Sequence, residues 1–386
     1  MTAKVGLPLS GRFSAMGTES GMRYLTEARA LEAQGVDIVH LEIGEPHFDT
    51  PPVAVEAATR ALREGATHYG PAAGLPGLRQ ALATDVSGWS GIALGPGNVA
   101  VVPGSKMIVL GTLLAFTEPG DEVVVFEPGF PVYAALARLV GCTVKTVPLR
   151  ASDAFRPDAS ALAKAIGSRT RVVVTNWPHN PTGTVLRADD AAAIRDVVRE
   201  RDVIVVTDEL YRDLSFTPDA VSLFAAIADP ERCVLMDGFS KRWAMTGWRL
   251  GFAVASERII AALVALTTNT TTCATTFGQL GAVAALRDGG AWQREMLNEL
   301  RRLRDVAVGA IGTAGLETVT PDGALYCFVH TGGDSRAKAK ELLHNGVATM
   351  PGAAFGTDGD GHVRVTYSVP EERLREGIGR MARARG

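Results

Sequence analysis

Cysteine is scarce in this chain of 386 residues, and nothing in its placement suggests pairing. The cysteines show no C-x-x-C spacing, and three of the four lie in apolar or β-like runs; they are Cys142, Cys233, Cys273 and Cys327. Thiols in such runs are more often buried and free than joined in disulfides or bound to a metal. We therefore expect no metal site, and a reducing, cytoplasmic location.

An excess of charge is also missing. The formal net charge is −3 and no basic run is present, which argues against nucleic acid or an anionic membrane surface as a partner. No apolar run approaches membrane-spanning length, and the N-terminal residues lack the apolar segment of a secretory signal. With 46% hydrophobic and 21% charged residues, the chain can bury large cores. These features indicate a soluble globular enzyme with two domains, or one large domain and an appendage.

Short apolar runs rich in β-branched residues alternate with segments of helical pattern. The expected strands are 36–43, 99–103, 122–126, 143–147, 171–175, 203–207, 233–236 and 250–254, and the expected helices include 20–34, 52–64, a segment ending near 87, one ending at 116 and 131–139. Apolar strands separated by helices are typical of a mainly parallel sheet covered on both faces. The predicted class is therefore α/β, preceded by an arm over residues 1 to about 20.

Polar residues at the carboxyl ends of these strands form the candidate site, because ligands of open α/β sheets lie there. In chain order the candidates are Gly104-Ser105-Lys106 at the start of a helix, Phe130 and Tyr133, Asn176 and Asn180, Asp208 and Tyr211, and Lys241. The free N–H groups that open a helix suit a phosphate. Each group taken singly has an ordinary explanation as a turn, a helix cap or a core residue. Their shared position at one edge of one sheet favours a site.

Lys241 has the most distinctive setting. It follows the strand at 233–236 and the turn-prone Asp237 and Gly238, and Arg249 comes a few residues later. Desolvation lowers the pKa of a lysine amine, and the neutral amine can attack a carbonyl to form a Schiff base. Pyridoxal phosphate is the cofactor that most commonly uses such a lysine. The alternative is a lysine that happens to lie at a strand end, and this stretch alone leaves it open.

The ordered motifs resemble those of the fold type I pyridoxal-phosphate enzymes, specifically the class I/II aminotransferase family in its bacterial aspartate aminotransferase-like branch. The similar segments run from LEIGEPHFDTP and THYGPAAGLPGLR through VPGSK, EPGFPVY, NWPHNPTG, DELY and SKRWAMTGWRLG to PGAAFG and HVRVTYS. The resemblance implies pyridoxal 5′-phosphate as the cofactor and a mainly parallel central sheet flanked by helices. It also implies a large cofactor-binding domain at 46–285 and a small α/β domain from residues 1–45 and 286–386.

The resemblance implies roles for individual residues. Lys241 matches the lysine that carries the cofactor as a Schiff base and then moves the proton at the substrate Cα. Asp208 matches the carboxylate that pairs with the pyridine nitrogen and so keeps the ring an electron sink. Asn180 and Tyr211 match the groups that hydrogen-bond the ring oxygen, and Phe130 matches the aromatic residue that stacks on the ring.

A second set of positions is implied to bind the cofactor phosphate. These positions are Gly104, Ser105, Lys106, Ser240 and Arg249. The guanidinium of Arg249 is a planar fork that matches phosphate oxygens. Many relatives have a serine where this chain has Gly238, so one hydroxyl is absent there or replaced by Ser240.

Substrate binding is implied for Arg364, which matches the arginine that grips the α-carboxylate, with Asn180 and Gly44 beside it. A carboxylate held in this way orients Cα for loss of its proton. Tyr69 matches a tyrosine that reaches the phosphate of the neighbouring subunit, which implies a homodimer.

The implied reaction is transfer of an amino group from an α-amino acid to a 2-oxo acid. The alternatives left open are a β-eliminating lyase and a decarboxylating or oxidative deaminase acting on an amino acid derivative in specialised metabolism, since the same cofactor site serves them all. The threonine-rich stretch 267–276 has no arginine for a side-chain carboxylate, although Arg23 could meet one. The sequence therefore does not name the amino donor.

Overall fold

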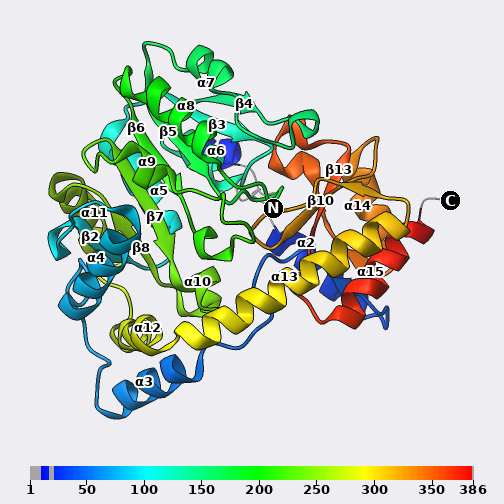
Figure 1. Cartoon of the computed structure of the whole chain (residues 1–386), viewed down its shortest axis with the longest axis horizontal. Coiled ribbons are helices and arrows are strands. Elements are labelled where there is room, and N and C mark those ends of the chain that lie inside the picture. The colour runs from blue at the N-terminus through cyan, green and yellow to red at the C-terminus, as the bar shows by residue number, and fades with distance from the viewer. Residues whose placement is uncertain (1–9, 17–20, 385–386) are drawn as a thin grey trace, which may run out of the picture.

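The computed structural model describes residues 10–16 and 21–384, and its largest sheet has seven strands (Figure 1). The strands lie in the order β2, β8, β7, β6, β5, β3, β4. Their bounds are β2 Val99–Val102, β3 Glu122–Glu127, β4 Thr143–Pro148, β5 Thr170–Asn176, β6 Ile204–Asp208, β7 Cys233–Gly238 and β8 Gly251–Val254. Each strand overlaps a run that the sequence pattern predicts.

The strands from β4 to β7 pair in parallel, through β4 with β3, β3 with β5, β5 with β6 and β6 with β7. Strand β8 runs antiparallel to both of its neighbours, β7 and β2. Parallel neighbours need crossover connections, and the crossover helices cover both faces of the sheet. The prediction of a mainly parallel sheet flanked by helices is confirmed.

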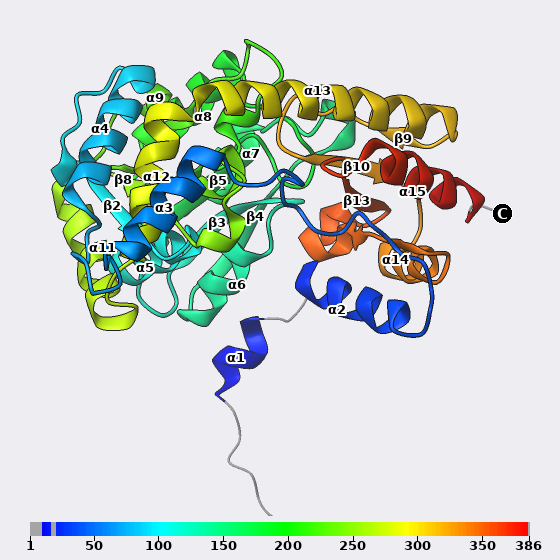
Figure 2. The same cartoon turned by 90° about the horizontal axis from the view of Figure 1, so that it is seen from below.

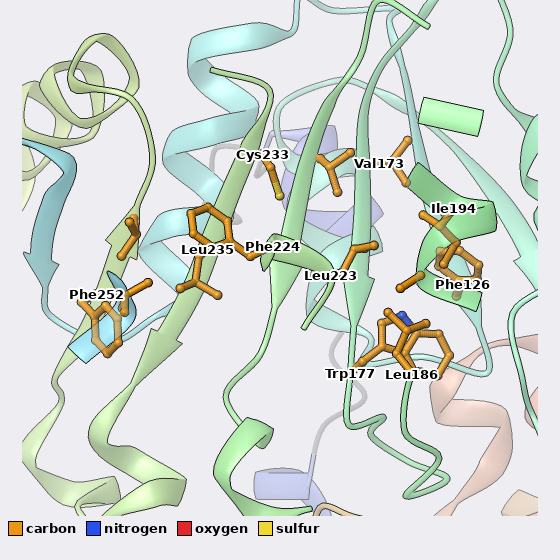
Figure 3. Packing of buried hydrophobic residues seen from close by; sticks show 14 of the residues in the cluster. Phe126, Val173, Trp177, Leu186, Ile194, Leu223, Phe224, Cys233, Leu235 and Phe252 are labelled. Carbon is orange, nitrogen blue, oxygen red and sulfur yellow. The ribbon is translucent and has the colours of Figure 1, made fainter. Parts of the chain in front are cut away.

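Each face of this sheet carries its own hydrophobic core, because successive side chains of a strand point to opposite faces. In β5, Val173 belongs to one core, and Val172 and Val174 belong to the other. Figure 3 shows the first core, where Val173 lies near Ile194 of α8 and Leu223 of α9. The helices that contribute to this core are α3 Pro52–Arg63, α4 Pro76–Ser90, α7 Ala159–Ala165, α8 Ala188–Arg199, α9 Leu223–Ile227 and α12 Thr276–Asp288. The helices that contribute to the other core are α5 Lys106–Phe116, α6 Val132–Leu139 and α11 Glu257–Thr270.

A second region lies along the far part of the long helix α13 (Gly290–Thr313) and has smaller sheets (Figures 1 and 2). One sheet has the order β12, β13, β10, β9, and β1 pairs with β11 in another. The elements of this region are α2 Gly21–Glu32, β1 Val39–His40, β9 Glu317–Thr318, β10 Tyr326–His330, α14 Ser335–His344, β11 Val347–Ala348, β12 Met350–Pro351, β13 His362–Thr366 and α15 Glu371–Arg383. Leu41, Leu303, Val363 and Ile378 share a core there. The domain boundaries at 45/46 and 285/286 stay predictions.

Two stretches near the N-terminus differ from the expected pattern. The strand expected at 36–43 shrinks to β1, because backbone carbonyls on either side of it accept from arginine side chains: the Asp37 carbonyl accepts from Arg380 of α15 and the Glu42 carbonyl accepts from Arg364. Within the predicted arm, Gly11–Met16 forms a short helix, α1, that lies against α6. Residues 1–9 and 17–20 of the arm lie outside the described residues.

All four cysteines are free, and three of them are buried. Free buried thiols are what their apolar surroundings predict. Within the described ranges, no helix combines the length and the apolar character needed to cross a membrane.

Candidate active site

The structure brings most of the candidate residues to one edge of the large sheet. Asn176 and Asp208 are the last residues of β5 and β6 and lie opposite each other in the strand register. Strand β7 ends at Gly238 and leads into the short helix α10 (Phe239–Arg242), which carries Lys241. The carboxyl ends of parallel strands must lie on the same side, so this gathering is a direct result of the topology.

The amine of Lys241 is turned toward the segment that leads into the smaller region. Its Nζ donates a hydrogen bond of 2.5 Å to the carbonyl of Gly44. Burial lowers the pKa of the amine to about 8; the negative charge of Glu45 opposes this shift, and the positive charges of Arg364 and Arg249 add to it. The amine therefore loses its proton far more readily than that of an ordinary lysine, and its neutral form can act as a nucleophile or a base.

Asp208 is a buried carboxyl group whose pKa is raised to about 6 by burial. Hydrogen bonds oppose that shift: the hydroxyl of Tyr133 donates to Oδ2 at 2.5 Å and the backbone N–H of Leu210 donates to Oδ1 at 3.1 Å. Burial, and then the negative charge of Asp208, raise the pKa of Tyr133 well above its ordinary value, so the phenol keeps the proton it donates. Asn176 holds the strand end by donating to the Asp208 carbonyl at 3.1 Å.

Arg364 is a buried cation held from three sides. One terminal nitrogen donates to Oδ1 of Asn180 at 3.0 Å, and the other donates to the carbonyl of Glu42 at 2.5 Å. The guanidinium lies between the rings of Tyr326 and Phe355, at 4.4 and 5.1 Å from their centroids. Its Nε is buried without a hydrogen-bond partner among the described residues. A buried cation with an unused donor suits an anionic ligand.

Tyr326 makes contacts on both the Lys241 side and the Arg364 side of the site. Its hydroxyl shares a 2.7 Å hydrogen bond with the hydroxyl of Tyr211 and donates to the Gly44 carbonyl at 3.5 Å. A Cβ atom at Gly44 would overlap the Tyr326 hydroxyl. Gly44 is thus required by this tyrosine, whereas the sequence pattern linked the glycine only to the substrate.

The start of α5 and Arg249 together form a cradle for an anion. Gly104 has a φ of +86°, and a Cβ atom there would overlap the guanidinium of Arg249. A Cβ atom on Gly251 would lie 2.5 Å from the backbone nitrogen of Ser105. Both glycines therefore let the turn before α5 come close to Arg249 and β8. An N-terminal helix end with free N–H groups beside a guanidinium is a favourable site for a phosphate.

Lys106 and Phe130 lie beside this cradle. The Lys106 Nζ is 5.6 Å from the centroid of the Phe130 ring. Burial, and then the positive charge of Arg249, lower the pKa of Lys106. Phe130 also packs edge-on against Tyr133, with ring centroids 5.6 Å apart, which places it next to the partner of Asp208.

Four positions stand apart from this group. Ser240 neighbours Lys241 on α10 but makes no hydrogen bond among those described for residues 10–16 and 21–384. Tyr69 is 87% exposed, so its ring contacts little of its own chain. At Gly238 a Cβ atom would lie 2.9 Å from the Leu250 carbonyl, so a serine would need the strand pair β7 and β8 to shift. Arg23 is paired with Glu27 on the same helix.

The sequence pattern undervalued two tyrosines of this site. The sequence indicates Tyr133 only as an aromatic residue after β3, although its hydroxyl is the direct partner of Asp208. It gives no sign of Tyr326, because this residue lies in the apolar run that forms β10 and resembles a core residue. A buried tyrosine hydroxyl needs a partner, and that requirement is the signal that could have pointed to both.

A mainly parallel α/β fold with a lysine at the carboxyl edge of its sheet is the arrangement of the fold type I enzymes, and solved structures of that class match this chain. The sequence profile described as "Aminotransferase class I and II" matches residues 36–381. The chain belongs to the class I and II aminotransferase family, whose members depend on pyridoxal phosphate, and it is an aminotransferase.

Individual relatives agree with this assignment. The chain is 36% identical to the aspartate/prephenate aminotransferase of Thermus thermophilus, over 98% of this chain and 99% of that protein. It is 38% identical to aromatic-amino-acid aminotransferase 2 of Thermococcus litoralis, over 90% of this chain and 92% of that protein. Among solved structures, the Thermus thermophilus aspartate aminotransferase with maleate matches with a TM-score of 0.94 and 35% identity, covering 98% of this chain and 100% of that one.

We predict that Lys241 of the cofactor-free protein reacts with an amine-directed reagent in a pH-dependent way, with a midpoint near pH 8. Only the neutral amine reacts, so the rate rises as the pH passes through this value. Glu45→Gln removes a negative charge that favours the protonated amine and should move the midpoint to lower pH. Residue-resolved mass spectrometry measures the rate. Glu64→Gln, a change at an exposed carboxylate at the end of α3, is the control and should leave the midpoint unchanged. A midpoint that stays near 8 in Glu45→Gln would contradict this electrostatic account.

Proposed function

We propose that this aminotransferase binds pyridoxal 5′-phosphate at the carboxyl edge of its large sheet and transfers the amino group of an α-amino acid to a 2-oxo acid. The observation that carries the proposal is the part-buried amine of Lys241, whose pKa is lowered to about 8. The surrounding groups fit this cofactor: the lysine amine for its aldehyde, Asp208 for its ring nitrogen, and the start of α5 with Arg249 for its phosphate. When bound, the cofactor supplies a ring that accepts electrons from the substrate Cα.

Asp208 and Tyr133 act as a unit in this proposal. Above a pH of about 6 the carboxyl group of Asp208 is ionised, and an ionised carboxylate keeps a proton on a ring nitrogen beside it. The Tyr133 hydroxyl favours that ionised form and fixes the orientation of the carboxylate. The residues Asn180 and Tyr211 would serve the ring oxygen, and Phe130 the ring face. The phosphate would be held by Gly104, Ser105, Lys106 and Arg249, with Ser240 as a further hydroxyl on α10.

The substrate carboxylate is proposed to bind Arg364. Its guanidinium is buried, charged and oriented by Asn180, Glu42 and two aromatic rings, so little reorganisation is needed when an anion arrives. Gly44 links Arg364 and Lys241. Its carbonyl accepts from the Lys241 amine and from the hydroxyl of Tyr326, and the Tyr326 ring packs against the Arg364 guanidinium. The neutral amine of Lys241 would then remove the proton from Cα, as a base whose pKa is close to the working pH.

A homodimer is part of the proposal. Tyr69 is exposed, and Thr276 anchors its segment by donating to the His68 carbonyl at 3.0 Å. Val55 and Leu62 on α3, together with Leu280 on α12, are exposed apolar residues on two helices that pack against each other. Exposed apolar side chains of this kind are typical of a subunit interface. A cytoplasmic location is also proposed, and the four free cysteines support it.

The proposed reaction predicts a single stoichiometric turnover when the holoenzyme meets an amino acid without a 2-oxo acid. We expect one equivalent of 2-oxo acid per site and no ammonia, because the amino group stays on the enzyme. Lys241→Ala should form no product, and after borohydride reduction its mass should lack the cofactor that the wild type retains. The 2-oxo acid and ammonia are measured by coupled assays for each amino acid in turn. Many equivalents of 2-oxo acid released with ammonia would identify a lyase or deaminase instead.

Arg364→Lys should raise the KM for the amino acid by about 10- to 100-fold, since one charged hydrogen bond of a two-point contact contributes about 1.5–3 kcal/mol. Steady-state kinetics at saturating 2-oxo acid measure the effect. Arg373→Lys is the matched control, because Arg373 lies on α15, outside the site, and pairs with the exposed carboxylate of Asp37. Equal KM values in Arg364→Lys and the wild type would place the carboxylate elsewhere.

The shared site predicts complementation between two defective subunits. Tyr69→Phe should weaken cofactor binding in the homodimer, because a phosphate hydrogen bond is lost. Mixed with Lys241→Ala subunits, it should regain one tight site per heterodimer, since that site combines its own Lys241 with the partner's intact tyrosine. Cofactor titration after subunit exchange measures the number of tight sites, and sedimentation measures the dimer. No tight site in the mixture would mean that Tyr69 serves its own subunit.

A further inference from the structure

A second cluster of charged side chains lies directly behind the lysine, around Arg242. Two nitrogens of its guanidinium donate to the carboxylate of Asp85 on α4, at 2.7 and 3.2 Å. Its Nε lies 2.6 Å from Oδ2 of Asp213, an ion pair whose direction is not that of a hydrogen bond. Asp213 also pairs with Arg212 at 2.8 Å. Arg242 thus joins two carboxylates from different elements.

Asp213 connects this cluster to the candidate active site and to the smaller region. It lies in the 3-10 turn Arg212–Leu214, which follows Tyr211 immediately. The side-chain nitrogen of Gln293 donates to Oδ2 of Asp213 at 3.2 Å. Gln293 belongs to α13, the helix that reaches from the large sheet to the smaller one (Figure 1). The Tyr211 segment, α13 and the Lys241 turn therefore meet at this carboxylate.

The short helix α10 needs external support because it has four residues. A single helical turn has no stability of its own, so its position depends on what its side chains contact. Phe239 and Trp243 are buried and hold its two ends in the core. The Arg242 side chain, 12% exposed, holds the intervening turn against α4 and Asp213. Lys241 lies between these anchored residues, and in the proposed function its amine must reach both the cofactor aldehyde and the substrate Cα.

The guanidinium of Arg242 is charged in this setting. Burial acts to lower its pKa, but Asp213 and Asp85 raise the pKa above its ordinary value. A planar, charged guanidinium between two carboxylates fixes its own orientation as well as its distance from each of them. A lysine at this position would keep the positive charge but lose the two-point contact with the Asp85 carboxylate.

We propose that Arg242 is a positioning residue for amino-group transfer, whose fork holds the Lys241 turn in place against α4 and against the segment that follows Tyr211. It touches neither substrate nor cofactor and acts through the placement of Lys241. The inference rests on the proposed function, since the placement matters only if Lys241 does the chemistry.

The test compares holoenzymes with Arg242→Lys and the wild type in steady-state transamination. We expect kcat to fall by about 100-fold, because a displacement of about 1 Å at a reacting group has an effect of that order. The KM for the amino acid should stay within about twofold, because the carboxylate site at Arg364 is unchanged. Asp85→Asn, which keeps Arg242 and weakens one side of its contact, should lower kcat in the same direction.

Arg156→Lys is the matched control. Arg156 makes the same two-point contact with Asp190 of α8, at 3.1 and 2.7 Å, and also pairs with Asp189. Its loss should lower the midpoint of thermal unfolding without changing kcat. A purely structural role for Arg242 would give the same pattern as this control.

Wild-type kcat in Arg242→Lys, or an equal fall in kcat in Arg156→Lys, would overturn the inference. A rise in KM with unchanged kcat would overturn it as well. If Arg242→Lys fails to fold, Asp85→Asn decides the question in the same way. A wild-type enzyme that transfers no amino group would instead contradict the proposed function, and the two failures are therefore distinguishable.

Discussion

Parallel pairing of β3, β5, β6 and β7 is the constraint on which the rest of the structure depends. It forces crossover helices over both faces, which explains the two separate cores, and it forces every carboxyl end to the same edge. The residues that follow the strand ends are therefore confined to this one edge of the sheet. Asp208 and Asn176 face each other because their strands are in register, and Lys241 follows the next strand.

The site combines groups that are costly to bury. Asp208, Arg364 and the Tyr211–Tyr326 pair are buried, and the lysine amine is held at a pKa of about 8. Such groups destabilise a fold unless they find partners, and here the partners are few and specific: Tyr133 for the carboxyl group, Asn180 and a carbonyl for the guanidinium. Perturbed pKa values concentrated at one strand edge are a feature of catalytic sites.

Much of the fold could be predicted because each local signal agreed with the next. The apolar β-branched runs before Gly104, Asn176, Asp208 and Lys241 are strands in the structure, and their polar ends meet. The exceptions have physical reasons. The strand expected at 36–43 is short because its backbone groups serve Arg364 and Arg380 instead of a sheet. The contacts made by Tyr326 escaped detection because a buried tyrosine in an apolar strand has the same local pattern as a core residue.

The sequence by itself determined the α/β class, the family and the order of the site residues along the chain, because strand, turn and helix signals are local and the alternation of strands with helices is typical of a mainly parallel sheet. The tertiary structure alone decided which of those residues touch. Gly44 and Lys241 are joined by a hydrogen bond, and Arg364 reaches Asn180, although long stretches of chain separate the members of each pair. Such contacts depend on how the smaller region packs against the large sheet, and no local pattern encodes that packing. The same holds for the pKa values, since burial and neighbouring charge exist only in the folded chain.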